Sequence, residues 1–157
     1  MHFRLALILP PPTEDDQDNE GWLESKITQY MDERNIETCR RCGIWDCHVI
    51  GGRFNERFYN EKGEWIGGEM TPASTRLDQA YEHDLDHNHH TVADQDKFKR
   101  RTFYRLIVVD EYEDPEEFEL LEDQHGWDKT IDHGIKIVRE RHTISDQHII
   151  VNIDYHA

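Results

Sequence analysis

The chain has 157 residues, a formal net charge of -16 at pH 7, 36% hydrophobic residues and 33% charged residues. At this length folding buries roughly 70% of the unfolded surface, so one core is sufficient. The negative charge disfavours direct binding to nucleic acid, which draws affinity from clustered Lys and Arg. Since no segment reaches the roughly 20 apolar residues of a membrane span, we predict one cytoplasmic domain over residues 1–157, without membrane contact.

Hydrophobic periodicity predicts strands and helices separated by polar turns. A run that is apolar on both faces, from Phe3 to Leu9, predicts an interior strand that ends at three prolines. Asp114, Pro115 and Glu117 supply an N-cap acceptor, a first-turn proline and a capping-box acid, which together predict a helix start. The predicted elements are a strand over 3–9, a helix over 20–34, strands over 44–50, 53–59 and 103–109, a helix from 114, a helix over 127–138 and a strand over 148–155.

The middle of the chain interrupts this framework. A hairpin tip is predicted at Asn60–Gly63, and the polar stretch from Gly67 to Arg101 has little strand pattern. We therefore predict an insertion over about 51–102, and a framework formed by residues 1–50 and 103–157.

Without the insertion, the element order is strand, helix, strand, strand, helix, strand. This is the order of a ferredoxin-like α+β sandwich, βαββαβ, whose two helices cover one face of the sheet. The first and third framework strands should be central and parallel, because both are apolar on both faces. Trp22 and Trp127 each belong to the apolar pattern of a predicted helix, and both are predicted as core side chains. The other face of the sheet should stay uncovered.

A motif around the second strand resembles the W-D-x-x-x-I-G-G-R-W pattern of a family of small phage proteins, common in phages of actinobacteria. Phe54 stands where that family usually has tryptophan. The resemblance extends to the first strand with its proline turn, to residues 114–118, and to a closing V-x-x-D-x-H. The matching residues are Trp45, Asp46, Ile50, Gly51, Gly52, Arg53, Val151, Asp154 and His156. The resemblance implies phage kinship and no mechanism.

Three thiols and an imidazole lie close together, in Cys39, Cys42, Cys47 and His48. Thiolates and imidazole are the ligands of tetrahedral structural zinc. An odd number of closely spaced cysteines fits reduced thiols or a metal better than disulfides. Because adjacent residues of a regular strand face opposite ways, Cys47 and His48 could share one metal only at a bulge. The alternative is that Cys47 is a core residue and the other thiols are exposed.

A second region is dense in metal-binding residue types. Its members are His83, Asp84, Asp86, His87, His89, His90, Asp94 and Asp96. The polar surroundings predict a solvated, flexible loop, with incidental metal capture as the alternative.

The sequence also predicts a ligand site on the uncovered sheet face. Gly51, Gly52 and Arg53 follow a strand and could present backbone donors and a guanidinium to an anion. The alternative is a β-bulge in which Arg53 pairs with Asp46. Strand alternation places two polar sets on the same face, at opposite edges of a four-stranded sheet and therefore about 14 Å apart at ~4.8 Å per strand. These sets are Asp46 and His48 on one strand, and Asn152, Asp154 and His156 on the other.

These features lead to three functional hypotheses. The first is a non-enzymatic phage accessory protein of the host cytoplasm that binds a small phosphorylated or nucleotide ligand, or a host protein, and counters host defence; an oligomer is compatible with it. The second is an acidic, nucleic-acid-mimicking inhibitor that occupies the basic groove of a host protein. The third is a metal-assisted phosphoesterase, with His48, Asp154 or His156 as acid or base.

Overall fold

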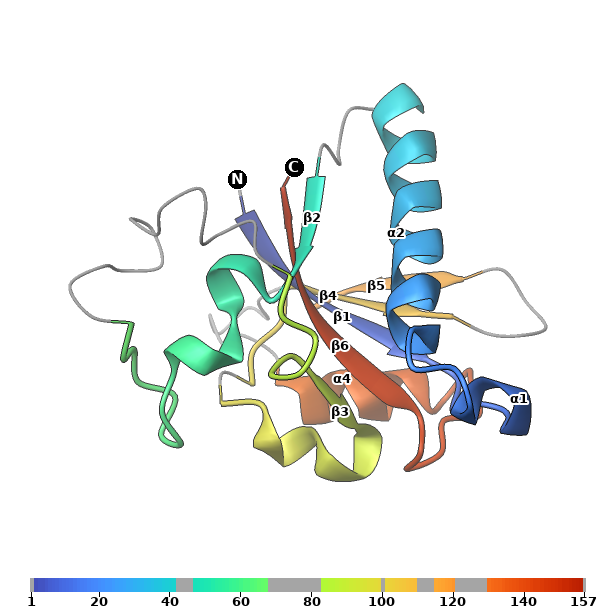
Figure 1. Cartoon of the computed structure of the whole chain (residues 1–157). Helices are drawn as coiled ribbons and strands as arrows, with labels where there is room; N and C mark the ends of the chain where they lie inside the picture. The colour runs from blue at the N-terminus through green and yellow to red at the C-terminus, as the bar shows by residue number, and fades with distance from the viewer. Residues whose placement is uncertain are drawn as a thin grey trace.

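The computed structural model describes residues 2–41, 47–67, 83–99, 101–109, 115–120 and 130–156. The strands are β1 (His2–Leu9), β2 (Cys47–Ile50), β3 (His89–Thr91), β4 (Arg105–Val108), β5 (Glu116–Glu119) and β6 (Ile149–His156). The helices are α1 (Glu14–Gln17), α2 (Trp22–Arg41) and α4 (Ile131–Val138), with the 3-10 turns η1 (Gly52–Phe54), η2 (Glu56–Phe58) and η3 (Val92–Lys97). Figure 1 shows their arrangement around the sheet.

One mixed, six-stranded sheet organises the fold. Its order is β2-β6-β1-β4-β5, and β3 also pairs with β6. β1 runs parallel to β4 and antiparallel to β6. The predictions of an α+β protein and of central, parallel first and third framework strands are therefore confirmed. Strands that are buried on both faces carry apolar residues at every position, as Leu5 to Leu9 do.

The ferredoxin-like topology itself is not confirmed, because the second framework strand lies elsewhere. That topology places it beside the third strand, β4, whereas β2 pairs with β6. The position beside β4 belongs to β5. The helix predicted from residue 114 is wrong for Glu116–Glu119, which form this strand. Its alternation explains the outcome, since Phe118 lies opposite apolar Leu106 while Glu117 bonds Arg105 at 2.6 Å.

The two long helices lie on opposite faces of the sheet (Figure 1). Ile27 and Met31 of α2 pack against β1, β4 and β6 on one face, and Ile131 and Ile135 of α4 pack on the other. The prediction that two helices cover one face is therefore wrong. The physical reason is that the central strands carry apolar side chains on both faces, so each face needs a layer to exclude water.

The predicted insertion over 51–102, of which the structure describes 51–67, 83–99 and 101–102, is called the middle segment below. Its described residues contribute to the core instead of forming a solvated appendage. Residues predicted as a strand over 53–59 are mainly 3-10 turns, although the hairpin tip is confirmed by the Tyr59–Trp65 bridge. Within the His-rich region β3 pairs with β6. Val92 and Phe98 are 2% and 1% exposed in the cluster under α4. The prediction of a flexible polar loop is wrong here, because these apolar side chains anchor the segment to the sheet.

Helix α2 is longer than predicted. It continues to Arg41, so the predicted end at residue 34 is wrong, and Cys39 lies in the helix. The helix predicted over 127–138 is confirmed from Ile131 to Val138, whereas Trp127 lies outside the described residues. Over the described ranges, none of the helices combines the length and apolar character needed to cross a membrane.

Candidate functional site

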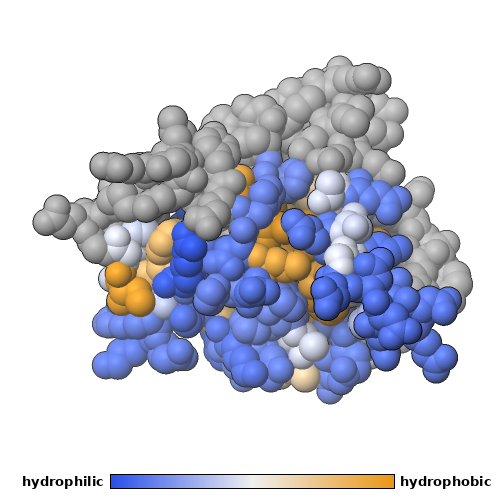
Figure 2. Space-filling view, viewed as in Figure 1, coloured by the Kyte–Doolittle hydropathy of each residue, from blue (hydrophilic) through white to orange (hydrophobic). Residues whose placement is uncertain are grey.

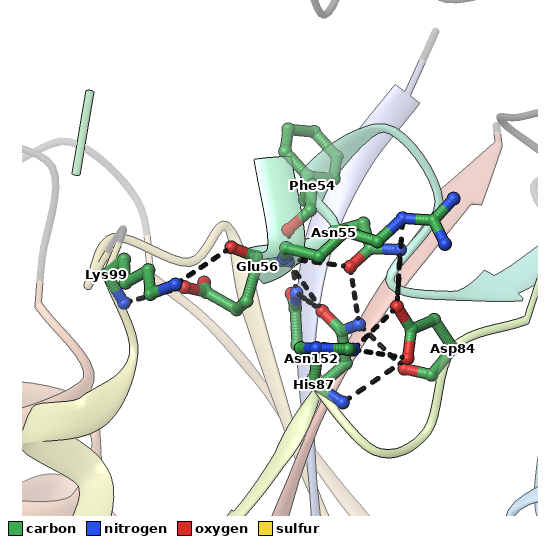
Figure 3. Close-up of polar contacts among 9 residues, drawn as sticks. Phe54, Asn55, Glu56, Asp84, His87, Lys99 and Asn152 are labelled. Carbon is green, nitrogen blue, oxygen red and sulfur yellow. Dashed lines mark hydrogen bonds and ion pairs between the residues drawn. The ribbon is translucent and has the colours of Figure 1, made fainter. Parts of the chain in front are cut away.

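The sheet face predicted to be open is closed by the middle segment. Asn152 is 0% exposed and Asp154 is 2% exposed. The Asn152 amide donates to the backbone oxygen of Phe54 and to Asn88 Oδ1, both at 2.8 Å (Figure 3). The prediction of a wet, uncovered face is therefore wrong. A buried polar group is stable only when it is hydrogen-bonded, and here its partners come from the segment that seals the face.

An ion pair lies at the centre of this buried polar network. Arg4 of β1 pairs with Glu56, and both residues are at most 4% exposed. Arg4 Nε also donates to Asn152 Oδ1 at 2.8 Å, and its guanidinium lies 4.1 Å from the ring centroid of Phe103. The second oxygen of Glu56 accepts the backbone N–H of Lys99 at 2.7 Å. The network joins β1 and β6 to both ends of the middle segment.

The Gly51–Arg53 loop does cradle an anion, but the anion is a side chain of this chain. The backbone N–H of Arg53 donates to Asp154 Oδ2 at 2.8 Å. Gly52 has a φ of 51°, and a Cβ there would lie 2.5 Å from Asp154 Cβ. The backbone N–H of Gly51 donates to the backbone oxygen of Asn152 at 2.9 Å. Gly52 is therefore explained by close packing against β6, and Gly51, at a φ of 82°, by close packing against the Asn88 side chain.

The predicted two-edge arrangement of the polar sets is also wrong. β2 and β6 are neighbours, so their residues are adjacent instead of lying at opposite edges. His48 stands opposite Tyr155, and Val49 stands opposite Asp154. Directly opposed residues share a face, so His48 and Asp154 face opposite ways and do not form the acid–base pair of a phosphoesterase. His156 pairs with Cys47 through the backbone, and Asp46 lies outside the described residues.

The proposed zinc ligands are only partly described. Cys39 is in α2 and Cys47 in β2, whereas Cys42 lies outside the described residues. Where the structure describes the chain, it brings together no group of three or more His, Cys, Asp or Glu residues suited to a metal. Zinc binding by Cys39, Cys42, Cys47 and His48 stays a prediction.

The histidines of the middle segment hold turns in place. His83 Nδ1 accepts the backbone N–H of Ile50 at 3.0 Å, and His87 Nδ1 lies 2.9 Å from Asp84 Oδ1. Burial raises the pKa of the Asp84 carboxyl, but hydrogen bonds from His87 and Asn55 outweigh it and leave the pKa below its usual value. The region thus has defined structural contacts where we predicted a solvated loop.

A pocket of about 410 Å³ lies where the two parallel strands end. It is lined by Leu9 at the end of β1, by Val109 directly after β4, and by residues of α1 and of the N-terminal half of α2. The lining residues are Leu9, Pro10, Pro11, Thr13, Asp16, Trp22, Lys26, Gln29, Tyr30 and Val109. We call this the α1–α2 pocket. Its volume falls within the small-molecule range of roughly 300 to 1,000 Å³.

Asp16 carries a fixed charge at the edge of this pocket. Its Oδ2 accepts the backbone N–H of Thr13 at 2.9 Å and the hydroxyl of Thr13 at 2.8 Å. Both hydrogen bonds lower the pKa of Asp16, and the bond from the Thr13 backbone has the larger effect. The Lys26 ammonium lowers this pKa further. The indole N–H of Trp22 also lowers this pKa, without an aligned hydrogen bond.

Sequence reasoning missed this pocket, although two signals pointed to it. Trp22 is half-buried and lines the pocket, whereas we predicted a core side chain. The first signal is the predicted parallel pairing of the strands over 3–9 and 103–109, because ligands of open sheets bind beyond the carboxyl ends of parallel strands. The second is the rigid proline turn that follows the first strand and keeps the chain extended there.

The surface around the sheet is mostly hydrophilic. Figure 2 shows a hydrophobic patch near the centre of the view, over the sheet and beside α2, and a further hydrophobic group at the left edge. Fold and site together define an α+β protein with a central mixed sheet and a pocket at the ends of two parallel strands. Comparisons with family models, curated proteins and solved structures found no match to this chain.

Proposed function

We propose that this chain is a binding protein whose ligand enters the α1–α2 pocket. The observation that carries the proposal is the combination of apolar walls and a few polar groups at the carboxyl ends of β1 and β4. Trp22, Tyr30 and two prolines supply flat apolar surface, and Asp16, Gln29 and Lys26 supply hydrogen-bonding groups. This composition is typical of small-ligand sites.

The proposal moves the site away from the Gly51–Arg53 loop. At that loop the backbone N–H of Arg53 already serves Asp154, and Asn152 is enclosed by the middle segment. A ligand there would have to displace buried hydrogen bonds, each of which costs about 1 to 3 kcal/mol when a partner is left unsatisfied. The α1–α2 pocket requires no such displacement.

The biological role that we propose is the accessory one expected from the phage-like motif. A small non-enzymatic protein of this kind would hold a host molecule and thereby counter a host defence. Zinc held by Cys39, Cys42, Cys47 and His48 would be structural in this proposal, since β2 contributes no residue to the described pocket lining.

The pocket assignment is tested by filling the pocket. Gln29→Trp adds a large side chain at an exposed lining position of α2, and Thr28→Trp adds the same group at the neighbouring exposed position outside the lining. The probes are indole, quinoline and benzamidine, titrated into labelled protein while the Trp22 indole and Lys26 amide signals are recorded by NMR.

We expect at least one probe to shift these signals in the wild type and in Thr28→Trp, and roughly tenfold weaker binding in Gln29→Trp, because a filled pocket removes the contact area. Equal binding to both variants, or no shift with any of the three probes, would overturn the pocket assignment.

A further inference from the structure

The charge around the α1–α2 pocket narrows the class of ligand. The segment that forms its rim carries Glu14, Asp15 and Asp18, all exposed, and Glu20 and Glu24 follow before the second turn of α2. Lys26 is the only basic residue of the described pocket lining. The field at the mouth is therefore negative, and it attracts cations and repels phosphates.

One carboxylate, that of Asp16, belongs to the pocket lining. Thr13 binds Oδ2 of Asp16 through both its backbone and its hydroxyl, which fixes the carboxylate and leaves Oδ1 without a hydrogen bond from the described residues. The lowered pKa of Asp16 keeps this group ionised under acidic conditions as well. A permanent negative charge beside apolar walls suits a positively charged ligand group.

The aromatic walls complete the arrangement. Trp22 and Tyr30 line the same pocket as Asp16 and pack against the apolar cluster under α2. The electron-rich faces of Trp and Tyr attract ammonium and guanidinium groups within about 6 Å, and Trp is the strongest partner. Pro10, Pro11 and Leu9 offer apolar contact to the rest of the ligand.

We infer that the α1–α2 pocket selects small organic cations, with an ammonium or amidinium group on an apolar or aromatic frame. This inference rests on the proposed function, because it names the ligand class of the same pocket. Asp16 and the aromatic walls receive the positive group. Lys26 is exposed and lines the same pocket as Asp16, so its ammonium competes with an incoming cation for the negative charge of the pocket.

Three probes that share a phenyl frame test the charge class: benzyltrimethylammonium, benzyl alcohol and phenyl phosphate. We expect the cation to bind most tightly and to weaken as salt rises, because screening removes part of the attraction. Asp16→Asn keeps an acceptor for Thr13 and removes the charge. It should weaken the cation roughly 3- to 10-fold and leave benzyl alcohol unchanged.

The matched variant is Lys26→Met, which keeps an unbranched stem and removes the competing ammonium. We expect it to strengthen binding of benzyltrimethylammonium roughly twofold to fivefold. The opposite pattern, in which phenyl phosphate binds most tightly and Lys26→Met weakens it, would overturn the inference. Equal binding of all three probes would also overturn the inference about the ligand class, but it would leave the proposed pocket intact. The proposed function is overturned only by the pocket-filling experiment with Gln29→Trp and Thr28→Trp.

Discussion

The two faces of the central sheet use the same strands to build different interiors. On the α2 face, alternate residues such as Leu5, Leu7 and Ile153 pack against α2 in an apolar cluster. On the α4 face, the cluster under α4 gives way to the Arg4–Glu56–Asn152 network, which the middle segment completes. Apolar packing is non-directional, whereas hydrogen bonds require particular partners. The apolar packing on the α2 face is therefore compatible with a pocket at the end of the strands. The hydrogen bonds on the other face fix where the middle segment lies on the sheet.

The ion pair of the polar face should produce the largest effect. Arg4→Met leaves Glu56 charged and buried, which we expect to cost about 3 to 5 kcal/mol of unfolding free energy. Ile27→Val on the apolar face, the control, should cost about 0.5 to 1.5 kcal/mol. Chemical denaturation measures both.

A second variant separates the ion pair from general damage. Adding Glu56→Gln to Arg4→Met removes the orphaned charge and keeps an acceptor for the Lys99 N–H. We expect the double variant to be more stable than Arg4→Met alone. The contrast between the faces would be lost if Arg4→Met cost no more than Ile27→Val.

The glycine motif should show the next largest effect. Gly52→Ala forces a Cβ to within 2.5 Å of Asp154 Cβ at a φ of 51°. We expect a loss of about 1 to 3 kcal/mol, the usual cost of overpacking and backbone strain. Gly21→Ala is the control, since its nearest contact would be 3.7 Å from Asn19 Oδ1. Thermal unfolding of the two variants should differ clearly, and matching midpoints would remove the packing explanation for the motif.

The smallest expected effect is a pH dependence at Asp84. Its folded-state pKa lies below the usual value of an Asp carboxyl, so its ionised form stabilises the protein above that usual value and the contribution is lost as pH falls through the folded pKa. Asp84→Asn should therefore cost about 1 to 2 kcal/mol at about pH 7 and progressively less in acid. A cost that stays constant down to about pH 2 would show that the charge has no part in holding the turn.

Part of the fold followed from local pattern alone. The strands β1, β4 and β6 and the helical character of α2 and α4 were predicted because periodicity of apolar residues reports burial directly. The α1–α2 pocket was not predicted, and the ligand site that was predicted instead is sealed. Gly51, Gly52, Arg53, Asn152 and Asp154 do come together, but within a sealed network. Pattern could not reveal this, because a buried polar residue with partners has the same alternation as an exposed one.

By itself, the sequence determined that the segments of β1 and β4 are apolar on two faces, and therefore that these two strands lie inside the sheet, because that property belongs to each segment. Only the tertiary structure decided the neighbour of β2, the helix layer on each face and the burial of Asn152. The partners of Asn152 lie 64 residues away at Asn88 and 98 away at Phe54. No local rule relates residues so distant in the chain, since their pairing depends on how residues 51–67 and 83–99 pack on the sheet.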